Sequence, residues 1–313
     1  MLRYRGNTIP RYSRAVIIYN PHSGQLKKGR AHRLVRAAEA LKGLAHDVSL
    51  TSTNGPRTAG QLAKTAIDEG ADLIVAAGGD GTISEVANGM VHSQVPLGIL
   101  PAGTANVLAN ETGLKRSVVA AARQMHDCVP SRISVGLVNF SEGNNWYFLL
   151  MLGAGFDAQI IYELSAGLKE KLGKLSYFLG GIGRLGRQLA ELEVRGKDGE
   201  WRRCTFALVS KVRNYGGDFE IAGRVRLTDD FFEVVLFQGK NSWRYLRYLA
   251  AVATRSVAGT SGVNSFDTDC LELRAVEPGV RVQADGEFLG TPPARVRMVP
   301  DALTVLLPEN TGR

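Results

Sequence analysis

Glycines and short polar residues follow an apolar run in the stretch LIVAAGGDGTISEVANGM at residues 73–90. The β-branched residues before the glycines indicate a buried strand, and apolar residues at helical spacing after them indicate a helix. Gly78, Gly79 and Gly81 carry no Cβ atom, so a ligand can approach the backbone closely there. Backbone N–H groups and the positive end of the following helix make this turn suited to an anion such as phosphate.

Asp80 and Thr82 lie within the same turn. A carboxylate inside an anion site would repel phosphate unless a cation lay between them. Asp80 therefore predicts that Mg²⁺ accompanies the phosphate. The alternative is a tight turn that needs its glycines for steric reasons alone.

Two further predicted strands end in turns of the same kind. The strand over residues 15–19 is followed by Asn20 and Ser23, and the strand over residues 96–100 by a small-residue turn that contains Thr104. Strands that alternate with helices are typical of a parallel sheet covered on both faces, and ligands bind at the carboxyl edge of such sheets. The remaining predicted elements of this half are a basic helix over residues 27–42, a strand over 48–50 and a helix over 58–68.

Two common nucleotide motifs do not account for this pattern. A Walker loop needs a lysine followed by a hydroxyl residue, whereas Lys174 is followed by Leu175. A glycine pattern at residues 153–158 has no acidic residue about 20 positions later to bind a ribose. We interpret it as a turn in which the chain packs closely.

Composition limits the class of protein. The chain has 313 residues, enough for two domains, with 44% hydrophobic and 22% charged residues and a formal charge of +8. That charge suits a nucleic acid, an anionic membrane or a phosphorylated ligand, but no nucleic-acid-binding module is recognisable. Three scattered cysteines, no apolar run of about 18 residues and no apolar signal-peptide core predict a cytoplasmic protein whose membrane contact is peripheral.

From residue 133 onward the pattern changes to many short alternating runs, which predict an antiparallel β-sandwich. Two predicted helical insertions interrupt these strands, at residues 158–189 and 243–257. The first mixes basic and apolar residues, so it could lie on an anionic bilayer. The alternative, an ordinary helix pair with a solvated basic face, stays open, and it is favoured for the second insertion.

The chain resembles the diacylglycerol kinase catalytic domain family, which includes bacterial lipid kinases, sphingosine kinases and ceramide kinases. The GGDG turn alone is shared with NAD kinases and phosphofructokinases, but a whole set of motifs in this order is specific. The motifs that carry the resemblance are NP and SG at residues 20–24, GGDGT with Glu85 and Asn88-Gly89, PAGTAN at 101–106, NYGG at 214–217 and DGE at 285–287.

The resemblance implies an α/β nucleotide domain over residues 1–130, to which residues 300–313 return, and a β-sandwich domain for the lipid over residues 131–299. The N-terminal domain would be a doubly wound parallel sheet, and the catalytic cleft would lie between the domains. The implied ATP contacts are Asn20, Ser23, Thr53, Gly78, Gly79, Asp80, Gly81, Thr82, Glu85 and Thr104.

The resemblance also assigns catalytic and metal-binding roles. Glu287 matches the catalytic base of the bacterial lipid kinases, although parts of the family have credited the aspartate that matches Asp80 instead. Asp229 matches the ligand of a structural Mg²⁺. Here the chain departs from the family pattern, with Asp230 in place of a glycine and Gly223 in place of a proline.

The function predicted from these residues is ATP-dependent phosphorylation of a lipid hydroxyl, with diacylglycerol favoured, ATP and Mg²⁺ as cofactors, and an anionic membrane surface as partner. A sphingoid base, ceramide or another lipid is an alternative substrate. A NAD kinase and a catalytically silent nucleotide-binding regulator are the alternative classes. The oligomeric state is open, with a homodimer as one alternative.

Overall fold

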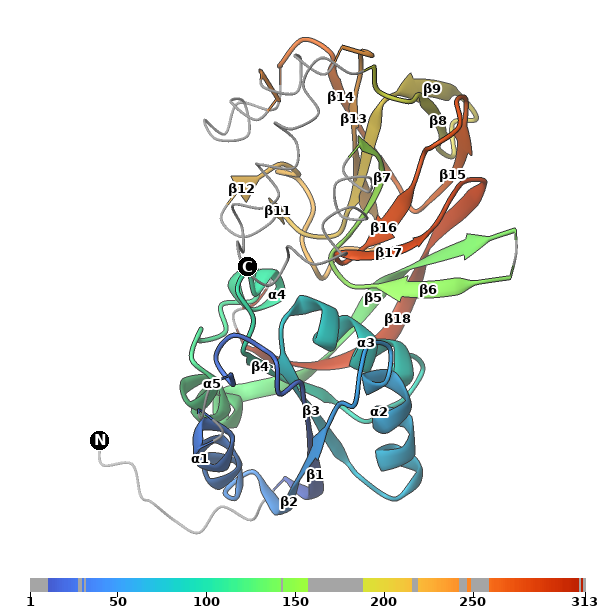
Figure 1. Cartoon of the computed structure of the whole chain (residues 1–313). Coiled ribbons are helices and arrows are strands. Elements are labelled where there is room, and N and C mark those ends of the chain that lie inside the picture. Colours follow the sequence, from blue (N-terminus) through green and yellow to red (C-terminus); the bar gives the residue numbers. More distant parts are fainter. Residues whose placement is uncertain are drawn as a thin grey trace. The chain divides into compact units, whose positions relative to one another are not determined.

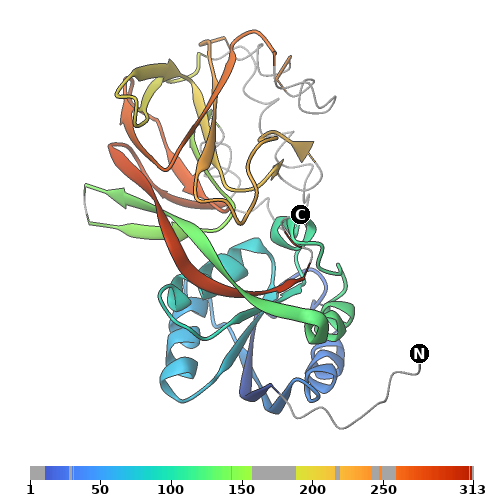
Figure 2. The ribbon, with the colours of Figure 1, turned by 180° about the vertical axis from the view of Figure 1, so that it is seen from behind.

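The computed structural model describes residues 11–27, 30, 32–141, 143–156, 188–215, 219–241, 247–248, 259–309 and 311. Two compact units divide the chain: unit 1 holds Met1–Arg132 and Ala302–Thr311, and unit 2 holds Ile133–Asp301. The chain passes between the units inside two strands, β5 (Cys128–Phe140) and β18 (Ala294–Pro308). β5 and β18 pair with each other, and Figure 2 shows them side by side.

Unit 1 is built on a parallel sheet with the strand order β2-β1-β3-β4-β18. Two of its central strands, β3 and β4, are completely buried, as a parallel sheet covered on both faces requires. Helices α1 and α5 lie on one face of the sheet, and α2 and α3 lie on the other (Figure 1). The elements are β1 (Tyr12–Tyr19), α1 (His32–Leu41), β2 (Ala45–Ser52), α2 (Ala59–Asp68), β3 (Leu73–Gly78), α3 (Asp80–Met90), β4 (Leu97–Pro101), α4 (Val107–Glu111), α5 (Val118–Gln124) and the 3₁₀ turn η1 (Met125–Asp127).

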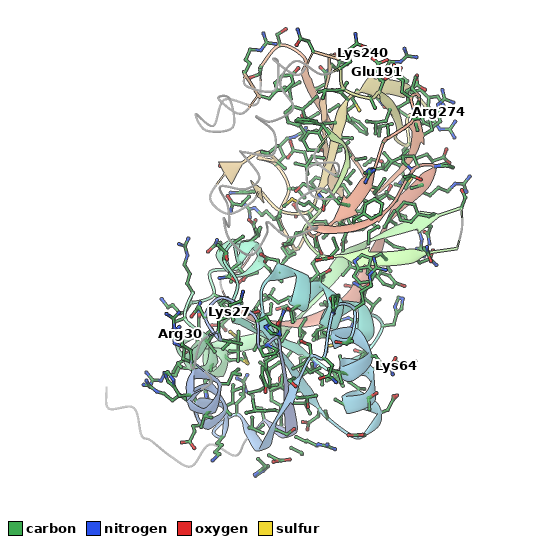
Figure 3. The ribbon with its side chains drawn as sticks, viewed as in Figure 1. Lys27, Arg30, Lys64, Glu191, Lys240 and Arg274 are labelled. Atoms are coloured by element: carbon green, nitrogen blue, oxygen red, sulfur yellow. The ribbon has the colours of Figure 1, made fainter. Side chains whose placement is uncertain are left out.

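Helix α1 is shorter than the sequence predicts, because it begins at His32 and not at Lys27. The backbone N–H of Lys27 donates to Ser23 O at 3.0 Å, so the chain first makes turns after β1. Lys27 and Arg30, labelled in Figure 3, lie on this connecting segment. Helix α3, in contrast, already begins inside the GGDGT motif, at Asp80, with Gly79 as its N-cap.

Unit 2 is an antiparallel β-sandwich. One of its sheets has the order β18-β15-β8-β9 and the other β14-β13-β10-β7-β16-β17, while β11 and β12 form a separate pair. The strands are β6 (Asn145–Phe148), β7 (Met151–Gly155), β8 (Leu192–Arg195), β9 (Trp201–Cys204), β10 (Phe206–Ser210), β11 (Asn214–Tyr215), β12 (Phe219–Glu220), β13 (Phe232–Phe237), β14 (Val263–Thr268), β15 (Cys270–Ala275), β16 (Val282–Ala284) and β17 (Glu287–Gly290).

The core of unit 2 lies between its two sheets and draws apolar side chains from both. Phe148 and Phe232 stack at its centre with ring centroids 5.6 Å apart. The predicted fold class, a doubly wound parallel-sheet domain plus an antiparallel sandwich, is thus confirmed. Strand β18 is a single long strand from Ala294 to Pro308. It continues because β15 pairs with its first half and β4 with its second.

Several sequence predictions fall on residues that the structure leaves undescribed. They are most of the two helical insertions at residues 158–189 and 243–257, and the glycines of the NYGG motif. Among the described residues, no helix has both the length and the apolar character needed to span a membrane.

Candidate functional site

The carboxyl edge of the sheet in unit 1 gathers the three predicted turns. Strands β1, β3 and β4 run parallel, so the turns that follow them emerge at the same edge. Backbone hydrogen bonds connect the turns: Asn20 N donates to Ala77 O at 3.1 Å, and Ala102 N donates to Gly78 O at 2.7 Å. The residues after β1, β3 and β4 therefore form one continuous backbone surface.

Glycine is required where these turns meet. A Cβ atom on Gly103 would lie 2.5 Å from Gly79 Cα, and one on Gly78 would lie 2.5 Å from Thr82 Cβ. Both distances are far below van der Waals contact: a side chain on Gly103 would push the turn after β4 away from the turn after β3, and one on Gly78 would displace Thr82 within the turn after β3. The first turn of α3 begins at this contact, with backbone N–H groups that the helix itself leaves unbonded. This combination is suited to binding phosphate.

Asp80 connects α3 to α4. Its Oδ1 accepts a hydrogen bond from Leu108 N at 3.2 Å, in the first turn of α4. Burial raises the pKa of Asp80, and hydrogen bonds from backbone N–H groups that include those of Val107 and Leu108 oppose this shift. The structure therefore shows Asp80 as a cap of α4. Its predicted contact with Mg²⁺ stays a prediction.

Glu85 has a structural role that the sequence did not indicate. Its Oε1 accepts from Arg57 N at 2.9 Å, and its Oε2 accepts from Ala59 N at 3.1 Å. Both carboxylate oxygens thus cap α2 and hold the loop that leads from Thr53 to α2. Helices α2 and α3 approach closely beside this cap, where a Cβ on Gly89 would lie 2.0 Å from Gly60 O.

The other predicted nucleotide residues of unit 1 follow its strands. Asn20 Oδ1 accepts from His22 N at 2.9 Å and so shapes the turn after β1, in which Ser23 is buried. Thr53 N donates to Tyr19 O at 2.9 Å, which fixes Thr53 beside the end of β1. Thr104 is exposed.

Asn106, a residue of the PAGTAN motif, organises the turn after β4. Its Oδ1 accepts from Gly103 N at 2.9 Å, and its Nδ2 donates to Gly103 O at 3.0 Å. Its backbone has φ 48°, in the left-handed region that asparagine adopts more readily than most residues. An asparagine directly before a predicted helix was the signal that could have identified it.

In unit 2, Asp285 fixes the DGE turn that carries Glu287. Its Oδ2 accepts from Leu149 N at 2.8 Å, and its Oδ1 accepts from Leu150 N and Met151 N at 2.9 and 3.0 Å. Gly286 has φ 85°, which suits glycine, and its N–H donates to Gln283 Oε1 at 3.0 Å. Glu287 is the first residue of β17 and is half-buried. Glu287 thus follows directly after a turn that hydrogen bonds of Asp285 and Gly286 fix in place.

At the predicted metal site, oxygens of Asp229 and Asp230 accept hydrogen bonds from the protein. Asp229 Oδ2 accepts from Arg226 N at 2.8 Å, and Asp229 O accepts from Lys211 Nζ at 2.7 Å. Asp230 Oδ1 accepts from Ser134 Oγ. Mg²⁺ requires near-octahedral oxygen coordination, and the Lys211 ammonium at the Asp229 carbonyl would repel a divalent ion bound to the same oxygen. These residues do not fit the predicted ion.

Comparison with known proteins agrees with this architecture. The family model of the diacylglycerol kinase catalytic domain matches residues 14–138, and the model of the YegS C-terminal NAD kinase beta sandwich-like domain matches residues 151–307. A diacylglycerol kinase from Bacillus subtilis (strain 168) is 30% identical over 308 residues, which cover 95% of this chain and 97% of that protein. A Klebsiella pneumoniae (strain 342) protein named "Probable lipid kinase YegS-like" is 28% identical over 88% of this chain and 91% of its own length.

A crystal structure of a diacylglycerol kinase from Bacillus anthracis str. Sterne has the same fold, with a TM-score of 0.77 at 20% identity over 96% of this chain and 98% of that one. The chain belongs to the diacylglycerol kinase family of lipid kinases, as its motifs predicted. It is accordingly an enzyme of the lipid kinase class, and membership of a kinase family implies the use of ATP.

Proposed function

We propose that this chain transfers the γ-phosphate of ATP to the free hydroxyl of diacylglycerol and so produces phosphatidic acid. The observation that carries the proposal is the joined backbone surface after β1, β3 and β4, where a Cβ on Gly103 would lie 2.5 Å from Gly79 Cα. Such a surface is built to bring backbone N–H groups up to a triphosphate. The choice of acceptor is supported by the Bacillus subtilis relative, which is named a diacylglycerol kinase.

The ATP would bind along this edge of unit 1. Backbone N–H groups of residues 79–82 would hold the phosphates, and Asn20, Ser23, Thr53 and Thr104 would line the rest of the nucleotide site. Mg²⁺ bound with ATP supplies charge neutralisation on the triphosphate during transfer. Asp80 and Glu85 shape this edge by capping α4 and α2, respectively. A further contact of Asp80 with Mg²⁺ is part of the proposal.

Glu287 is proposed as the general base. Its carboxylate accepts the proton of the lipid hydroxyl while the hydroxyl oxygen forms a bond to the γ-phosphorus. The bond from that phosphorus to the bridging β–γ oxygen breaks, and ADP leaves. A positioned base of this kind contributes on the order of 10²–10⁴-fold to the rate, and the Asp285 anchor provides the positioning.

The acceptor lies in a membrane, so the enzyme must reach a membrane surface from the cytoplasm. Its formal charge of +8 favours contact with anionic lipid headgroups. We therefore propose peripheral association with the inner face of an anionic membrane. Binding to vesicles that contain phosphatidylglycerol should weaken as salt is raised. Equal binding to neutral vesicles at high salt would contradict this part of the proposal.

The acceptor is tested by assaying transfer of labelled γ-phosphate from ATP in mixed micelles. Diacylglycerol, monoacylglycerol, sphingosine, ceramide and NAD are offered in parallel. Labelled phosphatidic acid as the main product supports the proposal. A preference for another lipid would support the lipid kinase activity but not diacylglycerol as its substrate. The Klebsiella pneumoniae relative is named only as a lipid kinase, without a stated substrate. Labelled NADP as the main product would contradict the proposed lipid kinase activity. If no acceptor is labelled, the chain is better explained as a catalytically silent nucleotide-binding protein.

A further inference from the structure

Lys211 is a completely buried lysine in unit 2, with 0% of its surface exposed. It follows directly after β10, and its Nζ donates to Asp229 O at 2.7 Å and to Met298 Sδ at 3.6 Å. A buried ammonium is costly unless hydrogen bonds and opposite charges compensate for its lost hydration. The surroundings of Lys211 compensate for part of this cost.

Two neighbouring carboxylates supply the opposite charge. Burial lowers the pKa of Lys211 to about 8, while the charges of Asp230 and Asp229 act in the opposite direction. Asp230 is in turn held by Ser134, whose hydroxyl donates to its Oδ1. The lysine thus lies among β5, β18 and the turn before β13, at the point where these segments of unit 2 meet.

The same oxygens are those that a divalent ion at this turn would need. The ammonium donates to the Asp229 carbonyl, Arg226 N donates to Asp229 Oδ2, and the Ser134 hydroxyl donates to Asp230 Oδ1. The ammonium also donates to the Met298 thioether, a soft ligand that Mg²⁺ does not favour. An ammonium 2.7 Å from the Asp229 carbonyl oxygen would repel a divalent ion bound to that oxygen, so the turn suits the monovalent cation of the lysine.

We propose that the Lys211 ammonium is the built-in cation of the Asp229–Asp230 turn and that this turn binds no divalent ion. The lysine takes the place of the structural Mg²⁺ that the family resemblance implies. Its ammonium binds the Asp229 carbonyl and lies near the negative charges of Asp229 and Asp230. Unit 2 then folds without Mg²⁺ at this position, and the enzyme's need for the ion comes from ATP alone.

Direct metal binding is the first test, on the full-length protein without nucleotide, with Mn²⁺ as a paramagnetic probe for Mg²⁺. Wild type and Asp229→Asn are titrated with Mn²⁺ and followed by electron paramagnetic resonance. We expect the two proteins to bind Mn²⁺ equally. Any Mn²⁺ signal that both share belongs to another site, so it also supports a metal-free turn. Binding by wild type that Asp229→Asn abolishes would overturn the proposal.

Thermal unfolding tests the lysine itself, again without nucleotide. Lys211→Met removes the charge but keeps most of the volume, and Lys64→Met is the matched control, because Lys64 is exposed on α2 (Figure 3). We expect the wild-type midpoint to be the same in Mg²⁺ and in EDTA, and the midpoint of Lys211→Met to fall well below that of Lys64→Met. Equal midpoints for the two variants, or a wild-type midpoint raised by Mg²⁺, would contradict the proposal. If Lys211→Met fails to fold, the Mn²⁺ comparison still decides the question.

Discussion

Asp285 and Met151 are joined by a reciprocal pair of hydrogen bonds: Met151 N donates to Asp285 Oδ1, and Asp285 N donates to Met151 O, both at 3.0 Å. The pair fixes the turn before β17 to the first residue of β7. Because Glu287 lies two residues beyond Asp285, the position of the proposed base depends on this connection.

Replacement of Asp285 should therefore reduce catalysis through Glu287. A displacement of about 1 Å can cost on the order of 10²-fold, so we expect Asp285→Asn to lower kcat by about 10–100-fold with KM for ATP unchanged. Steady-state kinetics measures both constants, with the exposed Asp198→Asn as control. If Asp285 acts by positioning Glu287, adding Asp285→Asn to Glu287→Gln should cause little further loss. Fully additive losses would contradict the connection.

Gly103 should tolerate no side chain. The added Cβ of Gly103→Ala would lie 2.5 Å from Gly79 Cα, so the turns after β3 and β4 must separate. We expect a loss of about 1–3 kcal/mol in the free energy of unfolding and weaker ATP binding. Urea unfolding and nucleotide titration measure the two effects. Gly55→Ala is the matched control, since a Cβ there would meet nothing within 4 Å. Equal behaviour of the two variants would show that the turns do not need their close contact.

Glu85→Ala should destabilise the loop after β2. The substitution removes the acceptors of Arg57 N and Ala59 N at the start of α2. Loss of a helix cap costs about 0.5–2 kcal/mol, and we expect the free energy of unfolding to fall by this amount while KM for ATP rises. Glu39→Ala, at an exposed position of α1, controls for loss of a surface carboxylate. An unchanged unfolding curve for Glu85→Ala would refute the capping role.

The buried Lys211 predicts a dependence of stability on pH. Burial lowers its pKa from 10.5 to about 8, so between these values the unfolded chain binds more protons than the folded protein, and stability rises with pH. The penalty for the buried charge is fully present below about pH 8 and disappears above about pH 10.5. Over this window the free energy of unfolding of wild type should rise by up to about 3 kcal/mol relative to Lys211→Met. A constant difference between the two urea midpoints would contradict the shift.

The sequence predicted those features of the fold that depend on the spacing of residues close together in the chain. Glycines after apolar runs indicated the turns at Gly78 and Gly103, because a turn that needs a bare backbone shows in the residues themselves. Alternation of strands and helices likewise predicted the parallel sheet of unit 1, and short alternating runs predicted the sandwich of unit 2.

Partners distant in the chain could not be predicted. Asp80 contacts the start of α4, Glu85 caps α2, and Asp285 binds the start of β7, more than 130 residues earlier. The sequence alone does not distinguish an acidic residue that binds a metal from one that accepts hydrogen bonds from backbone N–H groups, because its partner depends on the folded structure. Lys211 was missed for the same reason, because its burial beside Asp229 follows from the packing of β5, β13 and β18.

The role of Glu287 as the general base is tested by the rate of the chemical step with and without its carboxylate. Single-turnover transfer of labelled γ-phosphate to diacylglycerol is compared for wild type, Glu287→Gln and the exposed control Glu200→Gln, with thermal unfolding measured for each. We expect Glu287→Gln to lose about 10²–10⁴-fold in rate while its midpoint and ATP affinity stay at the wild-type values, and Glu200→Gln to behave as wild type. A Glu287→Gln enzyme that is folded and transfers phosphate at the wild-type rate would contradict the central claim.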